Sequence, residues 1–437
     1  MTATAATNTM RIPNGLSPFR RTGRVSRVVG LEIEVKGLNG GIGDAVLLGP
    51  PGRRIRAEVV AVSGNANILM PLGPASGLSP NDPAELIGGR MKLPVSDSFR
   101  GRVINAFGEP IDDGGAVPGP IEIVPFDSAA PSPLARRRID EPLPLGVRSL
   151  DALLPCGRGQ RVGVLAGSGV GKSTLLGMMA RGAAADVVVV SLVGERGREV
   201  REFLEDDLGP EGRANATVVV ATSDEPAMLR VRAAFTATRI AEWHAAQGRD
   251  VLLLMDSLTR VAMAQREIGL ATGEPPTTRG YPPSVFALLA SLLERAGPHP
   301  AGTITGLYTV LVEGDDLDEP ITDHARSILD GHYVLTRRLA TAGHFPSIDV
   351  PASTSRLVSK ILNREQIAEV NHVRALLSAL AEGRDLIELG AYVPGTNPTL
   401  DRALMVRDQL DELLRQDASS ISSWDEARRM LTEVIAS

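Results

Sequence analysis

The stretch RVGVLAGSGVGKSTLLGMMARG, residues 161 to 182, joins an apolar run to a helix-like run through a segment with three glycines and a lysine. A short valine- and leucine-rich run without polar alternation is typical of a strand that is buried on both faces. The stretch therefore predicts a strand, a glycine-rich turn and a helix, which is one unit of an α/β domain with a parallel sheet.

The same pattern continues in the sequence that follows this stretch. Further buried strands are predicted for DVVVVSLVG (186–194), ATVVVAT (216–222), DVLLLMD (250–256) and TITGLYTVLVEG (303–314). Between the last two, leucines and a valine recur at helical spacing, at Val285, Leu288, Leu289, Leu292 and Leu293. Strands that alternate with helices predict a parallel sheet covered by helices.

The regions on both sides follow other patterns. From about residue 23 to 94, short β-rich runs such as RVSRVVG and LEIEVKG alternate with glycine and proline, which predicts a small β-barrel or sandwich. A proline- and glycine-rich passage up to residue 146 predicts an irregular connector. After about residue 357, charged segments of helical period predict an α-helical region.

Composition argues against several classes of protein. The net charge of -6 over 437 residues argues against a nucleic-acid-binding protein, whose binding domain is usually basic. Cys156 is the only cysteine and no cluster has metal-ligand spacing, so we expect a reducing, cytoplasmic compartment. No apolar run approaches the ~18 residues that a membrane-spanning helix requires.

Residues 166–174 match the phosphate-loop pattern G-x-x-x-x-G-K-[ST] at every position but the first, where alanine replaces glycine. The glycines let successive backbone N–H groups face one anion, and the following helix adds the positive end of its dipole. We therefore expect a nucleotide site, with Lys172 on the β- and γ-phosphates and Ser173 on Mg²⁺. The expected nucleotide-binding residues are Gly167, Ser168, Gly169, Val170, Gly171, Lys172, Ser173 and Thr174.

Acidic residues follow two of the predicted strands. Asp256 ends one strand at the carboxyl edge of the sheet, where it can hold Mg²⁺ with its hydration shell. Glu195 follows another strand, where a carboxylate can orient and deprotonate an attacking water. Arg196, Arg198 and Arg260 suit the charge of a transferring phosphoryl group. Taken singly, such an acid is more often a helix cap, and such an arginine a surface ion pair.

Several motifs in sequence order resemble one family. They are AGSGVGKST (166–174), VGERGREVREF (193–203), REIGLATGEPPTTRGYPPSVF (266–286) and HFPSIDVPASTSRL (344–357). Together they resemble the rotary-type hexameric ATPases related to the catalytic subunit of ATP synthase. The third motif is most similar to the ATPases of type III protein export, above all the flagellar branch. The resemblance runs from about residue 23 to 404.

The resemblance implies an N-terminal β-barrel, a central RecA-like ATPase domain with a mainly parallel sheet, and a C-terminal α-helical domain. The expected bounds are 1–22 for a tail, 23–96 for the barrel, 97–357 for the ATPase domain and 358–437 for the helices. It also implies ATP and Mg²⁺, a homohexamer, and a place at the cytoplasmic face of a membrane export apparatus. The implied partners are a stator-like regulator and export chaperone–substrate complexes, with no nucleic acid.

The resemblance also implies roles for single residues. Glu195 falls on the family's catalytic glutamate, where noncatalytic subunits of ATP synthase carry glutamine. Arg196 and Arg260 fall on arginines that approach the γ-phosphate. Arg356 falls on an arginine finger that is supplied to the neighbouring subunit. Phe345 falls on an aromatic residue that stacks on adenine, and an ordinary core phenylalanine is the alternative.

Three other functions remain open at this point. They are the ATPase of a virulence-type injection system, a catalytic subunit of a proton-driven synthase, and an RNA-translocating terminator. The terminator should carry an N-terminal oligonucleotide-binding fold with stacking aromatic residues, whereas residues 22 to 96 contain no aromatic residue. Export ATPases often begin with a short amphipathic helix that binds a regulatory partner, and residues 1–19 show no such apolar stripe.

Overall fold

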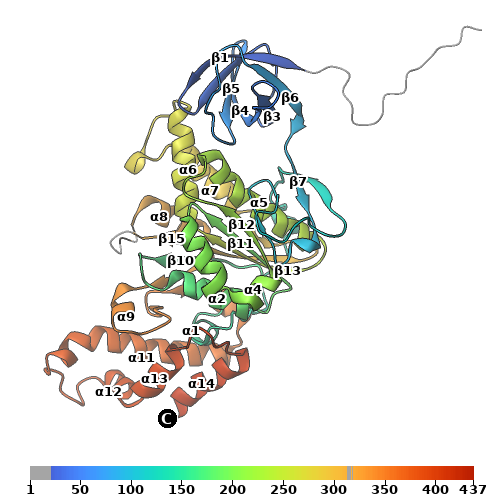
Figure 1. Ribbon diagram of the computed structural model, residues 1–437. Helices are drawn as coiled ribbons and strands as arrows, with labels where there is room; N and C mark the ends of the chain where they lie inside the picture. Colours follow the sequence, from blue (N-terminus) through green and yellow to red (C-terminus); the bar gives the residue numbers. More distant parts are fainter. Residues whose placement is uncertain (1–20, 313–315, 317) are drawn as a thin grey trace, which may run out of the picture. The chain divides into compact units, whose positions relative to one another are not determined.

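The computed structural model describes residues 21–312, 316 and 318–437, so all but the last two residues of the predicted tail lie outside the described residues. The described residues fall into two compact units, one that ends at Met91 and one that begins at Lys92 (Figure 1). Within the described part of the chain, none of the helices combines the length and the hydrophobicity needed to cross a bilayer.

The first unit contains a closed barrel in the strand order β1-β2-β5-β4-β3-β6. Its strands are β1 (Thr22–Val29), β2 (Glu32–Lys36), β3 (Asp44–Leu48), β4 (Ile55–Ser63), β5 (Ala66–Pro71) and β6 (Pro83–Arg90). Side chains alternate between two faces along a strand, and in β2 this places Ile33 and Val35 in the barrel core while their neighbours stay partly exposed. The N-terminal β-barrel is therefore confirmed.

The second unit is built on a sheet in the order β17-β16-β10-β15-β13-β11-β12-β8, and β14 pairs at the side of β15. Seven strands of this sheet are parallel. They are β8 (Val103–Ile104), β10 (Arg161–Ala166), β11 (Val187–Val193), β12 (Ala216–Ala221), β13 (Asp250–Asp256), β15 (Thr303–Leu311) and β16 (Gly331–Leu335). The short strands β14 (Gly297–Pro298) and β17 (Thr354–Ser355) are antiparallel. A separate pair joins β7 (Lys92–Val95) to β9 (Glu122–Pro125).

Helices cover both faces of this sheet (Figure 1). The connections from β10 to β11 and β12 move toward one edge, and those from β12 to β13, β15 and β16 move toward the other. Because such crossovers are right-handed, α2, α3 and α4 lie on one face and α5 to α8 on the opposite face. The bounds are α1 (Arg148–Leu153), α2 (Lys172–Gly182), α3 (Gly197–Glu202), α4 (Gly209–Asn215), α5 (Ala227–Ala246), α6 (Leu258–Ala271), α7 (Pro283–Leu293), α8 (Pro320–Ile328) and α9 (Arg337–Thr341).

The C-terminal part of this unit is helical, as predicted. It consists of α10 (Val358–Ile361), α11 (Arg364–Glu388), α12 (Pro398–Met405), α13 (Arg407–Leu414) and α14 (Trp424–Ala436). Asn363 starts α11 with a capping box to Gln366. Helix α14 packs on α1 and α11, so the apolar core of the helices is continuous with that of the sheet. Short 3-10 helices lie at Asp97–Phe99, Pro133–Ala135 and Thr278–Gly280, and a π-helix lies at Phe203–Asp207.

A buried ion pair ties α5 to the end of α7. Arg295 donates two hydrogen bonds to Glu242, at 2.6 and 2.8 Å, and both side chains are buried. Removing one partner leaves the other charge buried and unpaired, so we expect Glu242→Ala to lower the free energy of unfolding by about 3 to 5 kcal/mol.

Urea and thermal unfolding of the full chain measure this effect. The matched control is Glu205→Ala, which removes the exposed ion pair with Arg201 and should cost about 0 to 1 kcal/mol. Equal losses of stability in the two variants would contradict the assignment of Glu242 to a stabilising buried pair.

Candidate nucleotide-binding site

A cavity of about 590 Å³ lies at the carboxyl edge of the central sheet. Parallel strands end at the same edge, so the turns after β10, β11 and β13 contribute to its wall together. The predicted residues that line it are Gly167, Ser168, Gly169, Gly171, Lys172, Ser173, Thr174, Glu195, Arg196, Asp256 and Arg260. Residues from separate parts of the sequence are thus brought to one place.

The turn between β10 and α2 has the backbone of an anion-binding loop. Gly169 and Gly171 have φ angles of 74° and 86°, a left-handed conformation that side chains with a Cβ disfavour. Helix α2 begins at Lys172, so its first free N–H groups lie beside the cavity. Val170 is buried outside the cavity lining, and its carbonyl oxygen accepts a hydrogen bond from Ser347 Oγ at 2.6 Å. The hydrogen bond from Ser347 therefore holds the loop on the side away from the cavity, and the N–H groups of the loop can face an anion.

Lys172 links the loop to both predicted acids. Its Nζ lies 2.6 Å from Asp256 Oδ1 and 3.5 Å from Glu195 Oε1. Thr309 donates a further hydrogen bond to Asp256 Oδ1 at 2.6 Å. Burial lowers the pKa of Lys172, but the two carboxylates outweigh this effect and raise the pKa above its ordinary value. The lysine therefore stays cationic in a site that can take an anion.

Glu195 has an unusual acidity. Burial, the charge of Asp256 and a hydrogen bond with Glu199 together raise the pKa of Glu195 to about 7, against the attraction of Lys172. A carboxyl group that gains and loses its proton near neutral pH suits a general base. Arg260 opposes the rise in pKa of Glu195 through its positive charge.

The arginines near the loop differ in their surroundings. Arg260 lines the cavity from the first turn of α6, and its buried Nε has no hydrogen-bond partner among the described residues. A buried donor without a partner calls for an explanation, and a bound anion would supply one. Arg196 is exposed, 3.6 Å from Glu199. Arg198 pairs with Glu202 at 3.0 Å and is not among the residues that line the cavity.

Two predicted residues lie outside the cavity lining. Phe345 is 46% exposed, and its ring lies 3.5 Å from the position that a Cβ on Gly171 would take, so it stands beside the loop. Arg356 is exposed and lies beside Asp330, at the amino end of β16, with its backbone N–H on the Asp330 carbonyl. The structure thus separates Arg356 from the phosphate loop of its own chain.

Sequence reasoning missed three polar side chains of the site. Glu199 and Arg337 line the cavity, and Thr309 holds Asp256. Glu199 follows Glu195 by four residues, a spacing that could have signalled proximity on a helical turn. Arg337 begins α9, two residues after the end of β16, a strand that the sequence had not predicted. Thr309 is brought to Asp256 only by the pairing of β13 with β15.

Comparison with known proteins matches this chain along most of its length. Residues 146–355 match the model of the ATP synthase alpha/beta family, nucleotide-binding domain, and residues 362–433 match the T3SS EscN ATPase C-terminal domain. The flagellum-specific ATP synthase of Bacillus subtilis (strain 168) is 49% identical over 419 residues, which cover 95% of each chain.

Two further relatives belong to secretion systems. The type 3 secretion system ATPase of Sinorhizobium fredii is 47% identical and covers 92% of this chain and 90% of its own. The assembled ATPase EscN of enteropathogenic E. coli, solved in complex with its central stalk EscO, is 42% identical with a TM-score of 0.88, covering 94% of this chain and 100% of that one. The predicted resemblance is confirmed. The chain belongs to the family of flagellum-specific ATP synthases and type III secretion ATPases, and it is an ATP-hydrolysing enzyme.

Proposed function

We propose that this protein is a Mg²⁺-dependent ATPase that works as a homohexamer at a flagellar type III export apparatus, where it releases and unfolds export substrates held by chaperones. The observation that carries the ATPase part is the joint lining of one cavity by the phosphate loop, Lys172, Glu195 and Asp256. The relative EscN was solved as an assembled ATPase in complex with its central stalk. This supports a ring with a stalk-like regulator for the present chain.

In this proposal the phosphate loop binds the phosphates of ATP. The backbone N–H groups of residues 167–173 and the Lys172 ammonium would hold the phosphates, because both point positive charge at one place. Ser173 and Asp256 both line the cavity, and a hydroxyl with one carboxylate fits Mg²⁺, which usually keeps waters and substrate phosphates as its other ligands. When bound, Mg²⁺ would neutralise phosphate charge. Phe345, exposed beside Gly171, would stack on adenine.

In this proposal Glu195 and three arginines catalyse hydrolysis. Glu195 would take a proton from the attacking water, since its raised pKa lets it accept a proton near neutral pH. Arg196 and Arg260 would face the γ-phosphate from the same chain. Arg356 lies at the opposite edge of the sheet, and it would therefore serve the site of the neighbouring protomer in the ring.

ATP turnover per protomer, measured with particle mass from nanomolar to micromolar protein, tests the ring. We expect turnover to rise steeply as hexamers form, to vanish when EDTA removes Mg²⁺, and to be unchanged by added RNA. A rate per protomer that is flat across the range would contradict a site completed by assembly.

An injection-system ATPase is the second candidate, because the Sinorhizobium fredii relative is nearly as similar as the flagellar one. The match of residues 362–433 to a secretion-ATPase C-terminal domain favours both over a synthase subunit. Expression in a bacterium that lacks its flagellar export ATPase separates the two. Restored swimming supports the flagellar role, and failure to swim with normal ATP turnover in the extract favours the injection system.

A further inference from the structure

Arg356 sits at the end of a short strand at the edge of the sheet. It directly follows β17, which has only two residues and pairs with β16 alone, through Ser355 with Gly331 and Thr354 with His332. The guanidinium group donates a hydrogen bond to the Arg326 carbonyl at 3.1 Å. Such a short edge strand has little pairing energy of its own, so the position of Arg356 depends on the side chains that fasten this segment.

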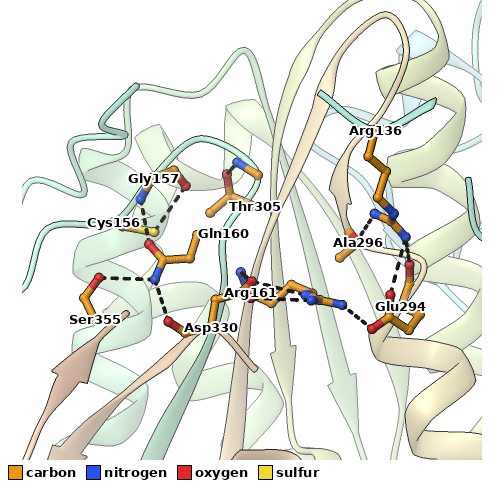
Figure 2. Close-up of polar contacts among 11 residues, drawn as sticks. Arg136, Cys156, Gly157, Gln160, Arg161, Glu294, Ala296, Thr305, Asp330 and Ser355 are labelled. Atoms are coloured by element: carbon orange, nitrogen blue, oxygen red, sulfur yellow. Dashed lines mark hydrogen bonds and ion pairs between the residues drawn. The ribbon is translucent and has the colours of Figure 1, made fainter. Parts of the chain in front are cut away.

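Gln160 is one of the side chains that hold this segment (Figure 2), and Arg374, which donates to the Ser353 carbonyl at 2.9 Å, is another. The Nε2 of Gln160 donates to the Asp330 carbonyl at 3.1 Å and to Ser355 Oγ at 3.2 Å, while its Oε1 accepts from the backbone of Gly157 at 2.8 Å. The Asp330 carbonyl also accepts the backbone N–H of Arg356 at 3.0 Å. One fully buried amide thus holds both the residue before Arg356 and the carbonyl to which Arg356 itself is bound.

Asp330 is in turn fixed to the start of β10 (Figure 2). Its Oδ2 accepts from the Arg161 backbone at 3.1 Å and from Arg161 Nε at 3.2 Å, and its own N–H donates to the Arg161 carbonyl at 2.8 Å. Arg161 is held from its other side by Glu294 Oε1 at 2.7 Å. The carbonyl that receives Arg356 therefore has a defined position relative to the central sheet.

We propose that Gln160 and Asp330 are positioning residues that orient Arg356 for the ATP site of the neighbouring protomer. This proposal rests on the proposed function, in which Arg356 acts in trans. Gln160 lies at the amino end of β10, and the phosphate loop lies beyond its carboxyl end. A change at Gln160 should therefore disturb the neighbour's site and spare nucleotide binding in its own chain.

Gln160→Glu is the sharpest variant, because glutamate keeps the shape and the Oε1 acceptor but removes both donors. Misplacing a catalytic group by about 1 Å can cost about 100-fold, so we expect kcat to fall about 10- to 100-fold, with the Kd for ATP unchanged. Gln416→Glu is the matched control. Gln416 is also buried, accepts from the Arg148 backbone at 2.8 Å and donates to the Gly146 and Ser420 carbonyls. The Gln416→Glu variant should lose about as much thermal stability as Gln160→Glu and keep the wild-type turnover.

Mixtures of variant protomers distinguish a misplaced Arg356 from a general loss of activity in the Gln160→Glu protomer. Lys172→Ala protomers lack a working site but keep the finger, so mixed with Gln160→Glu protomers they should restore turnover. Arg356→Ala protomers lack the finger, so mixed with Gln160→Glu protomers they should not. Restoration by Arg356→Ala but not by Lys172→Ala, or normal turnover of Gln160→Glu alone, would overturn the proposal.

The reference mixture is Arg356→Ala with Lys172→Ala. If these two restore no turnover, the finger in trans fails, and the positioning role fails with it. If they do restore turnover and Gln160→Glu behaves otherwise than stated, only the positioning role fails. Should Gln160→Glu not fold, Ser355→Ala removes the hydroxyl that accepts from Gln160 and donates to Pro155 at 2.9 Å, and the same mixing pattern is required of it.

Discussion

Glu195→Gln should lower kcat about 100- to 10,000-fold, the usual contribution of a general base, while the Kd for ATP stays within about threefold of wild type. Glutamine has the size of glutamate and keeps an oxygen toward Lys172, so the cavity should hold its shape. It cannot take a proton from water. Lys172 also keeps its closer partner, Asp256, at 2.6 Å, and the lysine therefore remains in place.

Steady-state ATP hydrolysis and equilibrium binding of a fluorescent ATP analogue measure the two quantities separately. Glu202→Gln is the matched control, because Glu202 pairs with Arg198 on the surface of α3, away from the cavity lining. Its turnover should equal that of wild type. Turnover of Glu195→Gln within about tenfold of wild type, with normal binding, would reject Glu195 as the base.

Five strands of the central sheet, β10, β11, β12, β13 and β15, were predictable because each is largely buried and reads as a mainly apolar run. β11 and β12 are buried along their whole length. The order of the strands was not predictable, since it depends on pairing between distant segments. The same limit applies to the first unit, where the alternatives of barrel and sandwich were decided by the pairing of Thr22–Arg24 with Pro83–Glu85, which closes the barrel.

The site shows a similar division between local and distant information. The phosphate loop was predictable because its glycines, lysine and serine are consecutive and the chemistry requires that order. The contact of Lys172 with Asp256 joins residues 84 positions apart, so it follows from the sheet and not from spacing. Gln160 could not have been selected at all, because a lone glutamine before a strand carries no signal until Asp330 and Ser355 are seen beside it.

Arg356→Ala should show the largest loss, a kcat about 10³- to 10⁵-fold lower, equivalent to about 4 to 7 kcal/mol of barrier. The Kd for ATP should stay near the wild-type value, because the proposed finger stabilises the transition state, whereas bound ATP is held by the phosphate loop. Arg356→Lys should recover little of the rate, since an ammonium group cannot reproduce the planar, two-pronged contact of a guanidinium with phosphoryl oxygens. Arg364→Ala, on the surface at the start of α11, serves as the control and should keep full turnover.

Mixing decides whether the lost arginine acts within or between protomers. In rings assembled at random from equal amounts of Arg356→Ala and Lys172→Ala protomers, about a quarter of the heterologous interfaces join an intact site to an intact finger. Turnover should therefore return toward about a quarter of the wild-type rate, although each variant alone is inactive. A mixture as inactive as its components would place the loss within the chain. The separation of Arg356 from the loop would then have to be closed by a movement of its own segment.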